Sequence, residues 1–119
     1  MPRPIPDRVK TLQEIQEAMD RFVASRGWYG ADSAKPQEPR NLAASISLEA
    51  NEVLECFQWS AKSKVESVAA ELADVVLYVA QLANVLEIDL GEAIESKLQL
   101  NDRRFPAIED DAWRERLAS

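Results

Sequence analysis

The 119-residue sequence contains no histidine and only one cysteine, Cys56. The absence of histidine excludes Ser-His-Asp and Cys-His nucleophiles and zinc sites with histidine ligands. The single cysteine excludes an internal disulfide and a Cys-x-x-Cys metal site. Basic residues are also scarce, because 14 of them stand against 21 acidic residues, which gives a net charge of −7. Nucleic-acid-binding domains typically carry a basic patch, so we expect no nucleic-acid partner.

Glycine is rare, and the sequence lacks the composition of a membrane or secreted protein. Only three glycines occur, and apolar residues recur at intervals of three and four, which predicts an all-α fold. We find no apolar run long enough to cross a bilayer and no N-terminal targeting signal. The expectation is therefore a cytoplasmic protein without a membrane partner.

Four helices are expected within one domain, because the chain length is typical of a single domain. The predicted helices cover residues 7–25, 41–60, about 63–86 and 89–104. The last two begin with the capping-box pairs Ser63–Glu66 and Asp89–Glu92. Residues 27–40 contain two glycines and two prolines and form the one long loop. We assign residues 1–106 to the domain and 107–119 to a C-terminal tail that could add a short helix.

Acidic residues dominate the middle of the chain. Between residues 41 and 96 there are ten acidic residues and only two basic ones, Lys62 and Lys64. Five of the acids lie inside predicted helices with no basic residue three or four positions away: Glu49, Glu52, Glu55, Glu71 and Asp74. Solvent-facing helices usually mix acids with bases at these spacings. The pattern therefore favours carboxylates that face a cavity or a cation.

Two pairs of these acids are predicted to meet across a helical hairpin. Glu49 and Glu52 precede a short turn at 61–62 by about 11 residues, and Glu71 and Asp74 follow it by about as many. At about 1.5 Å per residue, both pairs lie roughly 16 Å from the turn. Four adjacent carboxylates need protons or a cation. Oxygen ligands select Mg²⁺, Mn²⁺ or Ca²⁺ over zinc, and acid pairs on helices, without the ligand loop of a calcium hand, favour Mg²⁺, with Mn²⁺ as a substitute. The alternative is that all four are solvated on the hairpin surface.

A second set of residues suits a phosphate and a base. Lys97, Asn101 and Arg104 share one face of the last predicted helix and could bind phosphate groups. The alternative is that its basic residues only stabilise the helix dipole. Trp28 and Trp59 could stack on a nucleobase or act as hydrophobic anchors.

These residues form motifs that resemble the MazG-like all-α nucleoside triphosphate pyrophosphohydrolases, and in particular their dCTP pyrophosphatase branch. The motifs are Asn41-Leu42, Glu49-x-x-Glu52-x-x-Glu55-x-Phe57-Gln58-Trp59, Glu71-Leu72-Ala73-Asp74-Val75, Asp89-Leu90 and Lys97-x-x-x-Asn101-x-x-Arg104-Phe105-Pro106. The resemblance implies a four-helix bundle that is completed by homo-oligomerisation, as a dimer or tetramer. It also implies hydrolysis of a nucleoside triphosphate, such as dCTP or a modified deoxynucleotide, to the monophosphate and pyrophosphate, as in nucleotide-pool sanitation.

The resemblance assigns roles to individual residues. It implies that Glu49, Glu52, Glu71 and Asp74 bind Mg²⁺, that Trp28 and Trp59 contact the base, and that Lys97, Asn101 and Arg104 hold the phosphates or sugar. Without histidine, a carboxylate must act as general base, and Glu52 and Glu55 are the candidates. Met19 stands where mammalian relatives carry a histidine near the base.

Two other functions are compatible with the same residues. A non-catalytic helical interaction module would use the acids as a solvated or partner-binding face. An all-α phosphohydrolase for dUTP, dUDP or a phosphoribosyl nucleotide would share the metal chemistry and differ in substrate.

Overall fold

The structure is a computed structural model that describes residues 8–59 and 64–108. Its helices are α1 (Leu12–Ser25), α2 (Pro39–Glu55), α3 (Val65–Val85) and α4 (Leu90–Arg104). The described residues contain four helices and no strand. The prediction of an all-α fold with four helices is confirmed.

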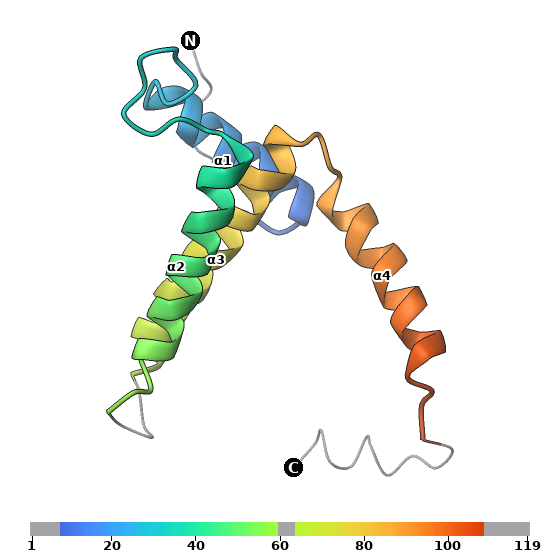
Figure 1. Ribbon diagram of the computed structural model, residues 1–119. Coiled ribbons are helices and arrows are strands. Elements are labelled where there is room, and N and C mark those ends of the chain that lie inside the picture. Colours follow the sequence, from blue (N-terminus) through green and yellow to red (C-terminus); the bar gives the residue numbers. More distant parts are fainter. Residues whose placement is uncertain (1–7, 60–63, 109–119) are drawn as a thin grey trace.

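The helices form an antiparallel hairpin, a crossing helix and a projecting helix (Figure 1). Helices α2 and α3 run side by side along their lengths, and α1 packs on α3 near the end of the hairpin that lies away from its turn. The described core gathers at that end, where Val23 of α1, Leu42 of α2 and Ala80 of α3 are almost completely buried. Helix α4 contacts α1 and then extends away from the hairpin.

The start of α1 differs from the prediction. The apolar spacing predicted a helix from residue 7, but α1 begins at Leu12 because Thr11 forms a capping box. The Thr11 hydroxyl accepts a hydrogen bond from the Glu14 amide at 3.1 Å, and the Glu14 carboxylate accepts one from the Thr11 amide at 3.0 Å. These bonds satisfy two of the amides that a helix start leaves free. Val9, which the predicted range of 7–25 includes, lies before the helix.

The ends of α2 and α3 also differ from the prediction by a few residues. Helix α2 begins at Pro39, whose fixed backbone suits a first helical position. It ends at Glu55 instead of residue 60, because the next amides bond to carbonyls only three residues back, as in Phe57 N–H to Leu54 C=O at 3.0 Å. Helix α3 begins at Val65, and Ser63, its predicted cap, lies outside the described residues, as does most of the predicted tail, including Trp113.

The boundaries of α4 agree with the prediction. The Asp89 carboxylate accepts a hydrogen bond from the Glu92 amide at 3.0 Å, and the helix ends at Arg104, before Pro106. The turn before it uses a left-handed residue, Glu87, with a φ of 57°. The Ile88 amide then bonds back to the Ala83 carbonyl at 2.8 Å and closes the end of α3.

Helix α3 corrects one expectation about hydrophobic runs. By length and composition Val65–Val85 could cross a membrane, since its most apolar window has a mean hydropathy of 1.5. The core helix of a soluble bundle has the same composition, and α3 packs between α2 and α1. Only 17% of that window is buried within the chain. Leu72 and Val76 of α3 are 50% and 41% exposed, so part of this apolar surface lacks cover from the described residues.

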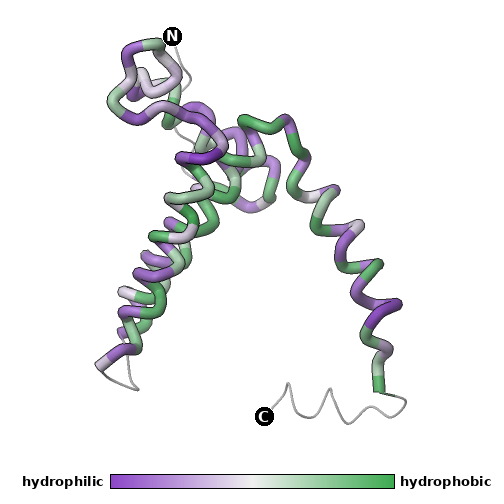
Figure 2. Tube along the Cα trace, viewed as in Figure 1, coloured by the Kyte–Doolittle hydropathy of each residue, from purple (hydrophilic) through white to green (hydrophobic). Residues whose placement is uncertain are grey.

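The uncovered apolar surface continues on α4. Hydrophobic residues recur along this helix although it stands clear of the hairpin (Figure 2). They include Ile94, Leu98 and Leu100, all exposed in the single chain. Phe105 follows the helix and is 66% exposed.

The capping box on α1 provides a test of the revised boundary. We expect Thr11→Ala to lower the free energy of unfolding by about 1 kcal/mol, because the Glu14 amide loses its acceptor. Thermal denaturation followed by circular dichroism measures the change. Thr11→Ser keeps the hydroxyl and is the matched control, with a melting temperature close to that of the parent. Equal melting temperatures for Thr11→Ala and the parent would contradict the assigned helix start.

Candidate metal centre and adjoining cavity

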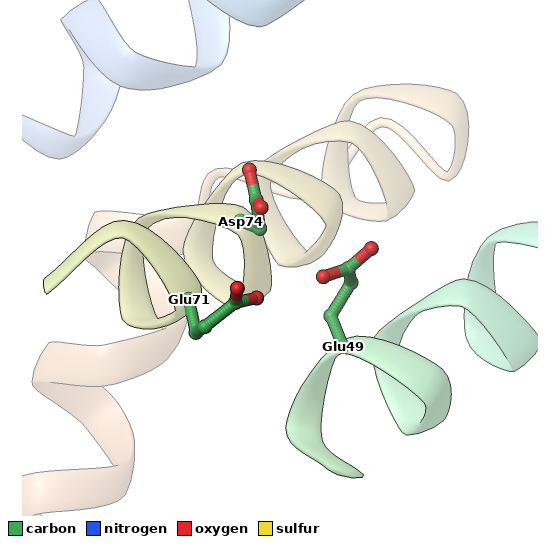
Figure 3. Close-up of side chains that lie close together, drawn as sticks. All are labelled: Glu49, Glu71 and Asp74. Carbon is green, nitrogen blue, oxygen red and sulfur yellow. The ribbon is translucent and has the colours of Figure 1, made fainter. Parts of the chain in front are cut away.

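Three carboxylates meet between α2 and α3 (Figure 3). Glu49 of α2 points across the seam toward Glu71 and Asp74 of α3, and one oxygen of each lies within 4.8 Å of the others. Glu71 and Asp74 are three residues apart, which places both on the same face of α3. Glu49 and Glu71 are partly buried in the seam, and Asp74 is exposed at its edge.

The three carboxylates repel one another. The pKa of Glu49 is raised, first by partial burial and then by the negative charges of Asp74 and Glu71. No lysine or arginine occurs from residue 41 to 59 or from 65 to 86 to offset these charges from the same two helices. A group of carboxylate oxygens with unbalanced charge is the arrangement that hard divalent cations bind.

Glu52 lies beside this group and is not part of it. The sequence predicted that four carboxylates converge, but the three described above are Glu49, Glu71 and Asp74. Glu52 is exposed, and its pKa is raised first by the charge of Glu55 and by a hydrogen bond with it, and less by Glu71 and Glu49. The Glu52 side chain therefore interacts mainly with Glu55, three residues further along α2. These two residues are the predicted general-base candidates.

Two cavities adjoin the three carboxylates. One has a volume of about 340 Å³, and besides Asp74 it is lined mainly by apolar and aromatic side chains, including Phe22. The other has a volume of about 270 Å³ and is lined by residues of α1, α2, α3 and the 26–38 loop. Met19, Trp28 and Tyr78 line both. Asp74 borders the larger cavity directly, and the smaller cavity lies one helical turn further along α3, at Tyr78.

Trp28 is held in place from two sides. Its ring meets the Phe22 ring edge-on, with centroids 5.6 Å apart and an angle of 79° between planes. The Lys35 ammonium lies over the Trp28 ring, 4.7 Å from its centroid, as a cation–π contact. Gly27, with a φ of 72°, makes the left-handed turn after α1 that leads the chain to Trp28. The aromatic ring is therefore a fixed wall of both cavities.

Four other predicted site residues lie apart from the carboxylates in the single chain. Trp59 is 89% exposed and follows α2 near the turn of the hairpin, whereas Trp28 lies at the opposite end. Lys97, Asn101 and Arg104 belong to α4, which extends away from α2 and α3 (Figure 1).

The structure adds cavity residues that the sequence did not single out as ligand contacts. Lys35, Asn41 and Ser45 line the smaller cavity. Ser45 precedes Glu49 by four residues on α2, a spacing that could have placed it beside the acids. Tyr78 follows Asp74 by four residues on α3, a spacing that could have placed it beside the acids in the same way. Lys35 lies in an irregular loop, where spacing gives no comparable signal.

Comparison with known proteins decides the family. Residues 44–117 match the model of the MazG-like family, which is more than half of the chain. The chain belongs to the MazG-like family. The matched region includes the three carboxylates and all of α4, so the resemblance predicted from the sequence motifs is confirmed.

Individual relatives extend this similarity to most of the chain. The chain is 32% identical over 107 residues to dCTP pyrophosphatase 1 of Homo sapiens and 33% identical over 106 residues to that of Bos taurus. These alignments cover 82% and 81% of this chain and 60% of each relative, so the chain spans about three-fifths of their length. The chain is also 35% identical in sequence to a pyrophosphatase from Archaeoglobus fulgidus, and the crystal structure of that protein superposes on this one with a TM-score of 0.65. The alignment covers 87% of this MazG-like chain and 100% of that one.

The repulsion at Glu49 predicts a pH-dependent stability in metal-free buffer. A carboxyl whose pKa is raised by folding destabilises the folded state above that pKa, and the penalty disappears as the pH falls through it. We expect Glu49→Gln to raise the melting temperature by a few degrees at pH 7 in a chelator, the scale of an interaction of under about 1 kcal/mol. Differential scanning calorimetry from pH 7 to pH 4 should show this advantage shrinking.

Glu66→Gln is the matched control, because Glu66 is an exposed acid in the first turn of α3. It should not raise stability. A Glu49→Gln protein that is no more stable than the parent at pH 7 would contradict the repulsive cluster.

Proposed function

We propose that this MazG-like chain hydrolyses a nucleoside triphosphate to the monophosphate and pyrophosphate with the help of a divalent cation. One observation carries the proposal: three carboxylates converge beside two cavities that share the wall residues Trp28 and Tyr78, and one of the three, Asp74, lines the larger cavity. A polyphosphate needs a site for charge neutralisation, and a nucleobase needs an aromatic or apolar cavity. Both lie side by side in this chain.

The donor set fits Mg²⁺, with Mn²⁺ as a substitute. The three carboxylates offer only oxygen ligands, which hard cations prefer, and the chain has no histidine that would favour zinc. Glu49, Glu71 and Asp74 would hold the ion. When bound, it would neutralise triphosphate charge and lower the pKa of a coordinated water. Glu52 completes the ligand set that we propose, because its charge interacts with Glu71 and Glu49.

Residues of this chain supply the remaining functions. Glu52 and Glu55 are the proposed general bases, and the charge of Glu55 raises the pKa of Glu52, which favours uptake by Glu52 of the proton of an attacking water. Trp28 offers a ring face for the base, and the cavity walls exclude water around it. The named relatives are dCTP pyrophosphatases, which supports dCTP or a modified deoxynucleotide as the substrate and nucleotide-pool sanitation as the role.

We propose further that a second copy completes the site. Residues on α3 and α4 expose apolar side chains that a homodimer or tetramer would cover. Lys97, Asn101 and Arg104 project on a helix that leaves its own hairpin, so another subunit is the surface they can reach. In such an assembly they would contact the phosphates or sugar, and Trp59 would contact the base.

The activity is tested by pyrophosphate release from the four deoxynucleoside triphosphates and dUTP, with Mg²⁺ or with a chelator. We expect release with Mg²⁺ and none with the chelator, and Glu71→Gln or Asp74→Asn should lower kcat by more than about 100-fold, because each removes a cation ligand. Glu66→Gln is the control and should keep the parental rate. Pyrophosphate-free products, or parental rates in both ligand variants, would contradict the proposal.

The shared site is tested by complementation between subunits. Glu71→Gln removes a cation ligand, and Arg104→Ala removes a proposed phosphate contact on α4. If each site combines both parts from different subunits, co-expressed and co-purified mixed dimers should regain about half of the parental activity, because one of two sites is intact. Activity no greater than the sum of the two separate variants would show that each subunit forms its site alone.

A further inference from the structure

Gln81 of α3 is a polar side chain in the apolar core, with no exposed surface. Burying an amide is unfavourable unless its donors and acceptor find partners. All three sites on Gln81 are paired: its Nε2 donates to the Tyr29 hydroxyl at 2.9 Å and to Gln37 Oε1 at 3.2 Å, and its Oε1 accepts from Asn84 Nδ2 at 3.1 Å. No cavity described above includes Gln81 in its lining. Contact with a ligand in these cavities therefore does not explain why a polar side chain is buried at position 81.

The two amide hydrogens of Gln81 reach both ends of the loop formed by residues 26–38. Tyr29 lies near the start of this loop and Gln37 near its end. The Tyr29 hydroxyl accepts from Gln81 and donates to Asp20 of α1. Burial and the bond to Asp20 raise the pKa of Tyr29 to about 12, so the hydroxyl keeps its proton at neutral pH. A single buried side chain thus ties two distant points of the loop to α3.

The bond to Gln37 also fixes the segment that lines the smaller cavity. Because its oxygen accepts from Gln81, the Gln37 amide directs its Nε2 to the Lys35 carbonyl, at 2.8 Å. The Pro36 carbonyl accepts from Asn41 Nδ2 at 3.1 Å. Lys35, Pro36 and Gln37 are all cavity-lining residues, and Lys35 covers the Trp28 ring. Gln81 is therefore bonded to one residue of the cavity wall, Gln37, which is bonded in turn to a second, Lys35.

We propose that Gln81 is a positioning residue, which holds the 26–38 loop in the shape that binds the nucleobase. The inference rests on the proposed function, since that function places the base in this cavity. If the loop is already ordered, binding of the substrate does not have to pay the entropic cost of ordering it. If two or three of its side chains were free to move, they would have to be immobilised on binding, which would weaken binding by about tenfold. The carboxylates act on the phosphates and lie outside this hydrogen-bonded set, so the chemical step should be spared.

The test compares Gln81→Met with the parent and with Tyr29→Phe. Methionine matches the length of glutamine but makes none of its three hydrogen bonds. We expect Gln81→Met to raise KM for the preferred nucleotide by about tenfold while kcat changes by less than about twofold. Tyr29→Phe should raise KM less. The double variant should raise KM by less than the product of the two single effects, because both changes remove the same Gln81–Tyr29 bond.

A control separates positioning from loss of stability. Thr11→Ala destabilises the start of α1, away from the loop, and should leave KM unchanged when assayed well below its melting temperature. Hydrogen exchange adds a readout that does not need activity: the Trp28 and Lys35 amides, which bond to Val23 O and Ser33 Oγ, should exchange faster in Gln81→Met, whereas amides of α4 should not.

The outcomes distinguish failure of the positioning role of Gln81 from failure of the proposed function. Unchanged KM and unchanged loop exchange in Gln81→Met would overturn the positioning role and leave the proposed function intact. Faster loop exchange in a chain whose parent releases no pyrophosphate would support the anchor and reject the function, and with it the role in binding. If Gln81→Met does not fold, Tyr29→Phe decides alone: a raised KM supports the proposal, and a parental KM overturns it.

Discussion

Repulsion among Glu49, Glu71 and Asp74 is the constraint on which the site depends. An antiparallel α2–α3 hairpin brings their oxygens within 4.8 Å of one another, and these helices carry no basic residue there to balance them. The folded chain therefore holds a concentration of negative charge that costs stability until a cation or protons offset it. Such a cost is typical of a binding site, in which residues are arranged for a ligand at the expense of the free protein.

The rest of the structure is arranged around this seam. Beside the acids, Met19, Trp28 and Tyr78 line cavities of about 340 and 270 Å³. The carboxylates could bind a charged polyphosphate through a cation, and the cavities could hold an uncharged ring. The two lie next to each other along α2 and α3, and a nucleotide likewise joins a polyphosphate to a base. The apolar surface on α3 and α4 is exposed in the single chain, and in the proposed assembly a second copy would cover it and bring the basic side chains of α4 to the substrate.

Much of this arrangement could be predicted from the sequence, and the exceptions have physical reasons. Periodicity and the Asp89–Glu92 cap located the helices and the start of α4, and counting residues from the turn placed Glu49 level with Glu71 and Asp74. Local periodicity does not determine where a helix projects, so the direction of α4 could not be predicted. The apolar spacing around Val9 continued past the true start of α1, which the Thr11 cap determines. The burial of Gln81 could not be predicted, because two of its hydrogen-bond partners come from a loop 44 and 52 residues away.

The central claim is that the three carboxylates bind one divalent cation together. Anomalous X-ray diffraction from crystals grown with Mn²⁺ and a non-hydrolysable nucleoside triphosphate analogue tests it most directly. We predict an anomalous peak within coordination distance, about 2.0–2.3 Å, of oxygens from Glu49, Glu71 and Asp74, with the phosphates of the analogue beside it. A fully occupied analogue with no anomalous peak between these side chains would contradict the account.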